Sequence, residues 1–256
     1  MEWYETADIG KIESPALLLY RTRIQQNIDT ALSLIGDAGN LRPHIKTNKI
    51  NEVCQMMMLS GIQKFKCATI AEAEVLGLVK AKDVLLAYQP VGPKVNRFLN
   101  VITNYPATHF SCLIDNFESA EQISSIFNEA GLIANVWIDI NTGMNRTGVD
   151  AGSAKDLLDQ LLLLPGIFVK GLHLYDGHIT NTNFDIRSQQ ADKGFKKIEK
   201  VQAYYSQITG RSASIVAGGS PTFRAHIKRN VECSPGTFVF WDMGYKKNFP
   251  DEPFQC

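Results

Sequence analysis

Short apolar segments alternate with longer amphipathic segments along most of the chain. The apolar segments are rich in valine, isoleucine and leucine and span roughly four to eight residues, which is typical of strands buried on both faces of a parallel sheet. Eight of them follow one another from Arg42 onward. The predicted strands are residues 42–46, 64–67, 83–87, 109–114, 134–140, 169–175, 213–216 and 231–233.

The amphipathic segments between these strands predict helices. Their ranges are 22–35, 51–60, 70–79, 92–103, 119–130, 153–163 and 187–208. Asn116 or Ser119 can cap the helix that begins near residue 119, and Ser153 can cap the next one. Eight alternating units over roughly 200 residues predict an α/β fold, a (β/α)8 TIM-type barrel. A doubly wound sheet is the alternative, but no Gly-x-Gly-x-x-Gly follows the first strand.

The two ends of the chain fall outside these repeating units. Residues 14–20 are an apolar segment ahead of the first helix, in which 16–20 predicts a strand outside the barrel, and residues 237–245 have the pattern of a further strand and turn. No closing element follows them. We therefore expect residues 21–236 to form the barrel, and residues 1–20 plus 237–256 to form an incomplete second β-domain.

The composition is that of an ordinary soluble globular protein. Of 256 residues, 45% are hydrophobic and 20% are charged, and 26 basic residues balance 26 acidic ones. A formal charge of zero gives no electrostatic reason to expect binding to nucleic acid or to an anionic membrane. The N-terminus is polar and acidic, unlike a signal peptide, and no apolar segment approaches the ~20 residues of a membrane span. We expect a cytoplasmic protein.

The five cysteines are odd in number and show no Cys-x-x-Cys spacing. Cys67, Cys112 and Cys233 lie in or beside apolar strand segments, where a small buried thiol is the usual case. This pattern indicates a reducing compartment and a chain without disulfide bonds.

Functional side chains of such a barrel lie at the carboxyl ends of its strands. The first predicted strand ends at Lys46, and His44 lies two residues earlier on the same side of the strand. Partial burial at such a position favours the neutral amine, the form of lysine that attacks a carbonyl. The alternative for Lys46 is an ordinary solvated lysine. His44 has two interpretations as well, a site residue or a histidine whose hydrogen bonds are satisfied within the barrel.

The turn after the seventh strand, Ala-Gly-Gly-Ser-Pro-Thr, has the composition of an anion-binding turn. Gly218 and Gly219 let backbone N–H groups approach an anion closely, and Ser220 and Thr222 add hydroxyl donors. Barrels frequently bind phosphate on the loops after strands seven and eight, where this turn falls. The alternative is a tight turn that merely requires glycine. The Ser-Pro-Gly segment after strand eight is either a second wall of the same site or only a turn.

Two further strand ends carry candidate residues. Arg146 follows the fifth strand, and its planar guanidinium suits the oxygens of a ring substituent or a carboxylate, although a loop arginine can also simply face solvent. Tyr175 ends the sixth strand, and His173 points to the same side of that strand. His178 is either an acid or base or, as the more usual case, a structural histidine in a turn.

The octet Arg42-Pro-His-Ile-Lys-Thr-Asn-Lys49 resembles the pyridoxal-phosphate lysine motif of the D-threonine aldolase and D-serine dehydratase family, which belongs to the alanine-racemase-like barrel enzymes. The loop Thr-Gly-Met-Asn-Arg-Thr-Gly is similar to that family's Thr-Gly-Met-x-Arg-x-Gly, and Leu-Tyr-Asp-Gly-His is similar to its Gly-Tyr-Glu-Gly-His. These similarities extend over nearly the whole chain. They imply that pyridoxal 5'-phosphate is the cofactor and that Lys46 holds it as a Schiff base. The residues implied around it are His44, Arg146, Tyr175, Gly218, Gly219, Ser220 and Thr222.

The resemblance also implies a reaction. The cofactor acts as an electron sink for a carbanion at Cα, and the released Lys46 serves as a general base. D-threonine aldolase-like cleavage of D-3-hydroxy amino acids is the reaction implied first. The alternatives are a D-serine dehydratase, an amino acid racemase and a barrel that binds pyridoxal phosphate without turnover.

Relatives also imply a homodimer and a divalent metal that assists at the substrate hydroxyl group. Their metal ligands, a histidine and a nearby acidic or thiol residue, come from the second domain. No histidine follows Cys233 in this sequence. We therefore predict no metal site within this chain.

Overall fold

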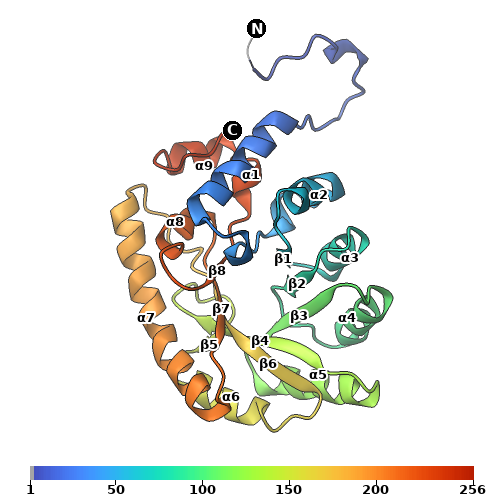
Figure 1. The fold of residues 1–256 in the computed structure, drawn as a ribbon, viewed down its shortest axis with the longest axis vertical. Helices are drawn as coiled ribbons and strands as arrows, with labels where there is room; N and C mark the ends of the chain where they lie inside the picture. The colour runs from blue at the N-terminus through green and yellow to red at the C-terminus, as the bar shows by residue number, and fades with distance from the viewer. Residues whose placement is uncertain (1–2) are drawn as a thin grey trace.

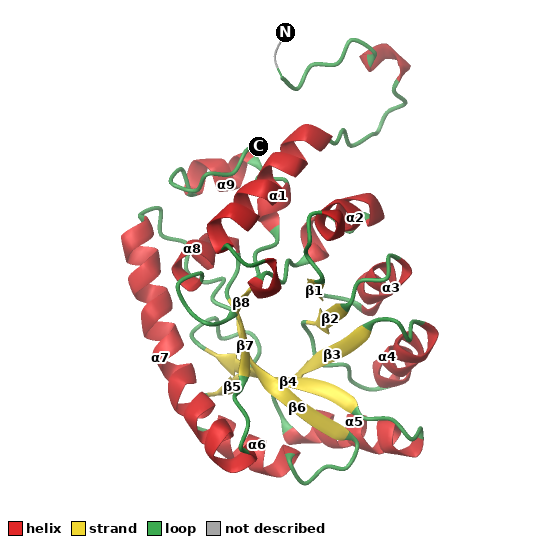
Figure 2. Cartoon of the chain, viewed as in Figure 1, coloured by secondary structure: helices red, strands yellow, loops and turns green. Residues whose placement is uncertain are grey.

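A parallel sheet forms the centre of the molecule and helices surround it, as Figure 1 and Figure 2 show for the computed structural model, which describes residues 3–256. A short strand, β5 (Val149–Asp150), pairs in parallel with the end of β4. Because all the pairings are parallel, the strands end at one edge of the sheet. The order across the sheet is β1 (Lys64–Cys67), β2 (Asp83–Leu86), β3 (His109–Ile114), β4 (Ala134–Asn141), β6 (Ile167–Leu174), β7 (Ser214–Ala217) and β8 (Glu232–Cys233).

The segment ahead of β1 closes this sheet into a barrel. Leu41 forms a parallel bridge to β8, and His44 forms one to β1. The N–H of Arg42 donates to a carbonyl of β8 at 2.8 Å, and the N–H of Lys66 donates to Pro43 at 2.8 Å. This segment fills the eighth strand position, so the predicted (β/α)8 barrel is confirmed.

Each of the seven predicted helices forms within a few residues of its expected range. Asn116 caps α5, because its side chain accepts the N–H of Ser119 at 2.9 Å. Ser153 precedes α6 without a side-chain capping bond. Within residues 3–256, none of the helices is long and apolar enough to cross a bilayer. The helices are α1 (Arg21–Ile35), α2 (Asn51–Leu59), α3 (Ile70–Leu78), α4 (Pro93–Asn104), α5 (Phe117–Glu129), α6 (Ala154–Leu161), α7 (Phe184–Thr209), α8 (Phe223–His226) and α9 (Met243–Asn248).

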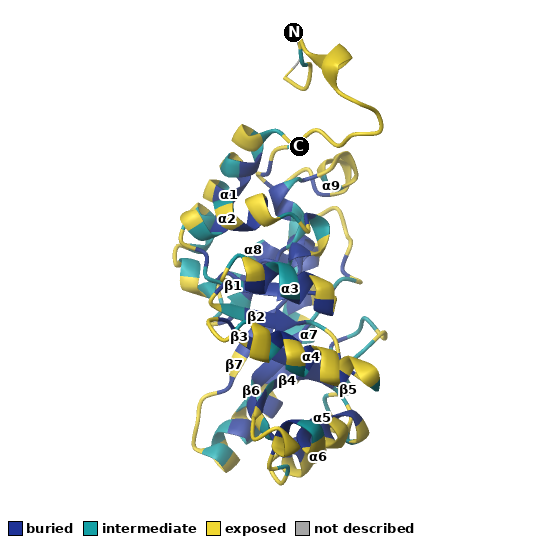
Figure 3. Cartoon of the chain, turned by 90° about the vertical axis from the view of Figure 1, so that its right-hand side faces the viewer, coloured by how far each residue is buried: buried dark blue, intermediate teal, exposed yellow. Residues whose placement is uncertain are grey.

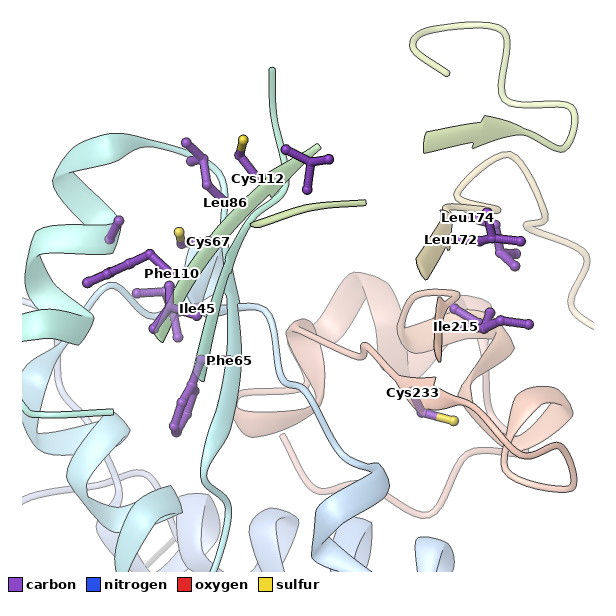
Figure 4. Packing of buried hydrophobic residues seen from close by; sticks show 14 of the residues in the cluster. Ile45, Phe65, Cys67, Leu86, Phe110, Cys112, Leu172, Leu174, Ile215 and Cys233 are labelled. Atoms are coloured by element: carbon purple, nitrogen blue, oxygen red, sulfur yellow. The ribbon is translucent and has the colours of Figure 1, made fainter. Parts of the chain in front are cut away.

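The main core lies between the strands and the surrounding helices. Alternate strand residues, such as Phe65 and Cys67 of β1, point outward into it (Figure 4). Cys112 and Cys233 are buried in the same core, as the sequence predicted. Figure 3 shows the matching pattern on the helices, whose outer faces are exposed. Each fully buried large apolar side chain contributes about 1.5–3 kcal/mol, so this shell is the principal hydrophobic stabilisation of the fold.

The other half of the strand residues point into the barrel and form layers. The middle layer is a small apolar cluster of Leu85, Leu113, Trp137 and Val216. The indole N–H of Trp137 donates to the hydroxyl of Ser111 at 3.0 Å, so the polar edge of this large side chain is satisfied within the layer.

The layer at the amino ends of the strands is a network of ion pairs. Arg42 is fully buried and contacts Asp83 at 2.7 Å and Glu232 at 2.6 Å. Lys170 also contacts Asp83, at 3.1 Å, and Lys64 also contacts Glu232. Burial alone would raise the pKa of Asp83, but the charges of Arg42 and Lys170 hold that pKa below its ordinary value. Each carboxylate of this layer therefore meets two cations.

Three predicted strand segments differ from the structure. The expected strand 42–46 leaves the sheet after His44, because Lys46 already belongs to the 3₁₀ turn η3 (Ile45–Thr47). The apolar segment 16–20 is no strand: Leu17 is 78% exposed and no sheet partner lies beside it among the described residues. The predicted strand and turn at 237–245 are wrong as well, since η5 (Thr237–Val239) and the start of α9 occupy them.

The C-terminal segment packs on the barrel through polar anchors as well as aromatic side chains. Asn27 of α1 accepts the N–H of Gln255 at 2.7 Å and donates to its carbonyl at 2.8 Å. Arg187, which is fully buried, contacts Asp251 at 2.6 Å and Glu252 at 2.9 Å. Whether the two chain ends belong to a second domain stays a prediction.

Candidate active site

Lys46 lies at the mouth of the barrel, where the closing segment turns away from the sheet. The turn is made by His44, whose ring Nδ1 accepts the backbone N–H of Lys46 at 3.1 Å. That bond leaves the hydrogen of the neutral His44 ring on Nε2. The Lys46 side chain is exposed, so its amine is accessible from solvent. His44 is half-buried, and burial together with the charges of Lys66 and Lys46 lowers its pKa well below the ordinary value.

A second lysine lies below the mouth, inside the barrel. Lys66 of β1 is 2% exposed, and its Nζ lies 3.4 Å from Nε2 of His173. The other ring nitrogen of His173 lies 2.7 Å from a carboxylate oxygen of Asp139. Burial lowers the pKa of His173. Burial would raise the pKa of Asp139, but the interaction with His173, the hydrogen bond to Thr147 and the charge of Lys66 hold that pKa below its ordinary value. The favoured arrangement is a neutral His173 that donates Nδ1–H to Asp139 and offers Nε2 to Lys66.

Burial, joined by the charge of Lys46, lowers the pKa of Lys66 to about 7. Arg146 also lies in this cluster, because its charge lowers the pKa values of His44 and His173.

These mouth cations have no carboxylate partner of their own. Among the ion pairs formed by residues 3–256, none includes Lys46, Lys66 or Arg146. Asp139 and Asp176 are the carboxylates whose charges act on Lys66, and both are hydrogen-bonded elsewhere, Asp139 to His173 and Asp176 to Thr222 and His226. The mouth therefore suits a ligand that brings negative charge.

Tyr175 connects this cluster with the glycine turn. The guanidinium carbon of Arg146 lies 5.3 Å from the centre of the Tyr175 ring, and Nζ of Lys66 lies 5.7 Å from it. A Cβ atom on Gly219 would lie 3.0 Å from the same ring. The Tyr175 ring therefore occupies the space that a side chain at position 219 would need, which is why glycine fits there.

The loops after β7 and β8 meet at Ser220. Its hydroxyl oxygen accepts the backbone N–H of Gly236 at 3.0 Å and that of Thr237 at 2.9 Å. Gly236 in turn lies against the closing segment, since a Cβ there would be 2.9 Å from the carbonyl oxygen of His44. The Ser-Pro-Gly segment is thus the second wall of the turn, beside Lys46. Because the Ser220 oxygen accepts both N–H groups, its own hydrogen is left to donate, on the loop after strand seven where barrels frequently hold a phosphate group.

Thr222 faces inward and does not line this wall. Its hydroxyl donates to Asp176 at 2.7 Å, and Nε2 of His226 contacts the second oxygen of that carboxylate at 2.7 Å. Arg229 reaches Nδ1 of His226 at 2.9 Å, which leaves the hydrogen of a neutral ring on Nε2 for Asp176. Gly218 is required here, because its φ is +75° and a Cβ would lie 2.6 Å from the His226 ring. This buried network fixes the shape of the glycine turn.

The structure brings most of the sequence-predicted residues together at one end of the barrel. The charges of Lys46 and Arg146 both lower the pKa of His44, and the Tyr175 ring lies against Arg146 and Gly219. Gly218 and Ser220 lie in the same turn. The exception is Thr222, whose donor serves Asp176. His178 is exposed and lies over the loop after β4, where a Cβ on Gly143 would be 2.8 Å from its ring.

Sequence reasoning missed Lys66 and Asp139 as site residues, together with Asp176 and His226. Lys66 and Asp139 could have been found from the alternation of inward and outward residues along a strand. Lys66 lies between Phe65 and Cys67, and Asp139 lies between Ile138 and Ile140, so both occupy inward positions of strands whose neighbours face the outer core. Asp176 and His226 carried no such signal, because neither lies within a strand.

The chain matches the model of the alanine racemase N-terminal domain over residues 20–243. It is similar to a D-threonine aldolase of Arthrobacter sp, with 25% identity over 254 residues that cover 96% of this chain and 65% of the relative. A D-threo-3-hydroxyaspartate dehydratase of Delftia sp. (strain HT23) is 24% identical over 242 residues, covering 91% of this chain and 62% of the relative. The chain thus spans less than two thirds of the length of these two relatives.

Solved structures show the same fold. The crystal structure of a D-threonine aldolase from Filomicrobium marinum superposes with a TM-score of 0.87 at 24% identity, covering 96% of this chain and 68% of that chain. The Delftia dehydratase superposes with a TM-score of 0.80 at 23% identity, covering 91% of this chain and 62% of that chain. The family model covers most of the described residues and the barrel topology agrees with it. The chain belongs to the alanine racemase N-terminal domain family.

Proposed function

We propose that the chain binds pyridoxal 5'-phosphate covalently through Lys46 and acts on D-amino acids, with D-threonine aldolase-like cleavage of D-3-hydroxy amino acids as its reaction. The observation that carries the proposal is the cluster of cations at the mouth, beside two glycine-containing loops. Lys46 supplies the amine, and the Ser220 hydroxyl, which keeps its own hydrogen, supplies a donor for the phosphate. The similarity to a D-threonine aldolase supports the reaction.

The residues present fit a phosphorylated aldehyde. Gly218, Gly219 and Gly236 each stand where a side chain would collide with the protein's own atoms, so glycine at these positions lets the two loops pack closely at the mouth. The hydroxyl of Ser220 accepts two N–H groups and keeps its own hydrogen to donate. When bound, the cofactor supplies an electron sink for cleavage at Cα.

The remaining roles follow from position and charge. Lys46 holds the cofactor at Nζ and, once released, accepts a proton there. Arg146 presents a permanent cation next to the Tyr175 ring and is suited to a carboxylate or a ring oxygen. His44, kept neutral by its buried cationic surroundings, fixes the backbone of Lys46 and presents Nε2–H toward the mouth. Tyr175 supplies an aromatic surface against which a planar ring can pack.

Three parts of the sequence-based interpretation continue as proposals. They are the homodimer, the cytoplasmic location and the assignment of the chain ends to a second domain. No group of three or more metal-ligating side chains occurs among residues 3–256.

The test is an absorbance spectrum followed by an assay. The full chain, incubated with pyridoxal phosphate and freed from excess, is expected to absorb in the visible range. It is then expected to release glycine and acetaldehyde from D-threonine, assayed with and without added manganese. Visible absorbance without cleavage under either condition would favour a barrel that binds the cofactor without turnover. A colourless protein would contradict the whole proposal.

A further inference from the structure

Lys66 is the most enclosed cation at the mouth end of the barrel. Its neighbours in β1, Phe65 and Cys67, face the outer core, so alternation directs Lys66 into the barrel. There its Nζ lies 3.4 Å from Nε2 of His173, which is itself fixed by Asp139 at 2.7 Å. A buried lysine without a carboxylate bonded to it is unusual, because burial penalises the charged form.

Every element packed around Lys66 contributes a titratable or charged group. From the closing segment these are His44 and Lys46, and Lys46 lowers the pKa of Lys66. The carboxylates of Asp139 and Asp176 oppose this effect, while Arg42 in the layer below adds to it.

On the β6 side, the Tyr175 ring lies 5.7 Å from Nζ and His173 accepts from it. Burial is the largest of all these influences, and the outcome is a pKa of about 7 for Lys66. The amine is therefore charged in part of the molecules and neutral in the rest near neutral pH.

We propose that Lys66 is a proton-transfer residue of this site, which takes a proton from the bound amino acid, whereas attachment of the free cofactor is the task of Lys46. The inference rests on the function proposed above and goes beyond it, because it gives the second lysine a separate task. Asp139 and His173 are positioning residues: they act on the ligand only through the lysine that they hold.

The proton balance is simple. The lone pair of neutral Lys66 accepts the proton of the substrate's β-hydroxyl group. The electron pair of that O–H bond forms the carbonyl of the aldehyde as the Cα–Cβ bond breaks, and the pair of the Cα–Cβ bond stays on Cα, where the proton is later returned. The resulting ammonium group donates to Nε2 of His173, whose Nδ1–H is held by the ionised Asp139. The ammonium then returns its proton to the product, which restores the neutral amine. No oxidant, reductant or further reactant is needed.

A fixed positive charge is the role that competes with proton transfer. A lysine that served only to attract a carboxylate would be replaceable by arginine, which keeps the charge and cannot lose its proton. Lys66→Arg therefore separates the two roles. Lys66→Met removes both the charge and the proton while keeping a similar length, so it controls for the bulkier guanidinium.

The first experiment measures kcat and KM for D-threonine against pH, using the full chain loaded with pyridoxal phosphate. Proton transfer of this kind contributes about 10²–10⁴-fold, so Lys66→Arg and Lys66→Met are expected to lower kcat at least ~100-fold with little change in KM. In both variants, the dependence of kcat on a group that titrates near pH 7 is expected to disappear. Lys64→Met, on the same face of the same strand but in the lower layer, is the matched control and is expected to keep kcat and the pH profile.

The second experiment needs no turnover. In the loaded protein, the ¹³Cε resonance of labelled Lys66, assigned by its absence from Lys66→Arg, is expected to titrate near neutral pH. Asp139→Asn removes a charge that favours the ammonium form, so it is expected to move this titration to lower pH.

The outcomes distinguish the two proposals. A chain that binds cofactor and cleaves D-threonine, but whose Lys66→Arg variant keeps wild-type kcat, overturns the role of Lys66 alone. A Lys66 resonance that titrates above pH 9 overturns it as well. A chain that takes up no cofactor or cleaves nothing overturns the proposed function, and the role of Lys66 falls with it.

Discussion

At the amino ends of the strands, Asp83 and Glu232 each contact two cations, whereas at the carboxyl ends Asp139 and Asp176 each contact a histidine. The lower layer is therefore neutralised by its own side chains. The cations of the mouth are not, since the nearest carboxylates are already bonded elsewhere. Cations and carboxylates thus pair with one another at the amino end of the barrel, whereas the cations at the carboxyl end have no carboxylate bonded to them.

This contrast explains why stability and ligand binding can be assigned to opposite ends. Arg42 is fully buried between two carboxylates, so removing it leaves charges without partners in the barrel. Lys66 is buried nearly as deeply, but its bonded neighbour is a neutral histidine. Removing the buried cation should therefore lower the free energy of unfolding at the amino end and raise it at the carboxyl end.

Arg42→Met is expected to have the largest effect. It leaves Asp83 and Glu232 beside only one lysine each, and breaking such a buried pair costs about 3–5 kcal/mol of unfolding free energy. Urea titration of wild type and variant measures the loss. A change below ~1 kcal/mol would mean that the lower network does not stabilise the barrel.

Lys66→Met is expected to raise the free energy of unfolding, and the size of this gain should depend on pH. The folded-state pKa of about 7 lies below the 10.5 of the unfolded chain, so the unfolded state binds more protons between these values. The penalty for burying Lys66 is fully present below pH 7 and is lost as the pH rises toward 10.5. Relative to Lys66→Met, wild type should therefore gain up to roughly 3 kcal/mol of stability between pH 6 and pH 9. Equal stability differences at both pH values would contradict the depressed pKa.

Gly218→Ala tests the wall of the mouth. The residue has φ of +75°, and the added methyl group would lie 2.6 Å from the His226 ring. The free energy of unfolding is therefore expected to fall by about 1–3 kcal/mol. Affinity for pyridoxal phosphate should fall as well, because the turn must shift. Gly210→Ala is a control for backbone strain: its φ is +67°, but no atom lies within 4 Å of the new methyl group. Equal losses of unfolding free energy in Gly218→Ala and Gly210→Ala would mean that backbone strain alone, and not the contact with His226, causes the effect.

Ser220→Ala is expected to have the smallest effect on stability, about 1 kcal/mol, because the N–H groups of Gly236 and Thr237 lose their acceptor. The variant should bind pyridoxal phosphate more weakly, while pyridoxal without its phosphate should be affected little. Equilibrium titration with the two aldehydes measures this difference. An equal loss for both would place the phosphate away from Ser220.

The alternation of apolar segments was sufficient to predict the barrel, because strands buried on both faces and helices of matching length leave few other folds. Lys46 and the glycine turn were located at strand ends, which meet at one edge of a barrel, and the octet around Lys46 was recognised by its resemblance to a family motif. What the pattern could not give was the contact partner of each polar residue. Thr222 looks like a ligand donor in the sequence, but its hydroxyl bonds Asp176.

Two other failures have physical causes as well. Leu17 and its apolar neighbours have strand composition, but a strand requires a partner, and the described chain offers none beside them. Residues 237–245 are apolar because they pack into the main core: Phe238, Val239 and Trp241 belong to it, and the Trp241 ring lies 5.0 Å from that of Phe254, centre to centre. Apolarity there reflected burial and not the type of secondary structure.

Covalent attachment of the cofactor tests the central claim most directly. The full chain is incubated with pyridoxal phosphate, reduced with borohydride and digested, and the modified peptide is identified by mass spectrometry. The account predicts a single reduced cofactor on Lys46, and none on the chain carrying Lys46→Ala. Attachment at a different lysine in wild type, or no stable attachment at all, would contradict it.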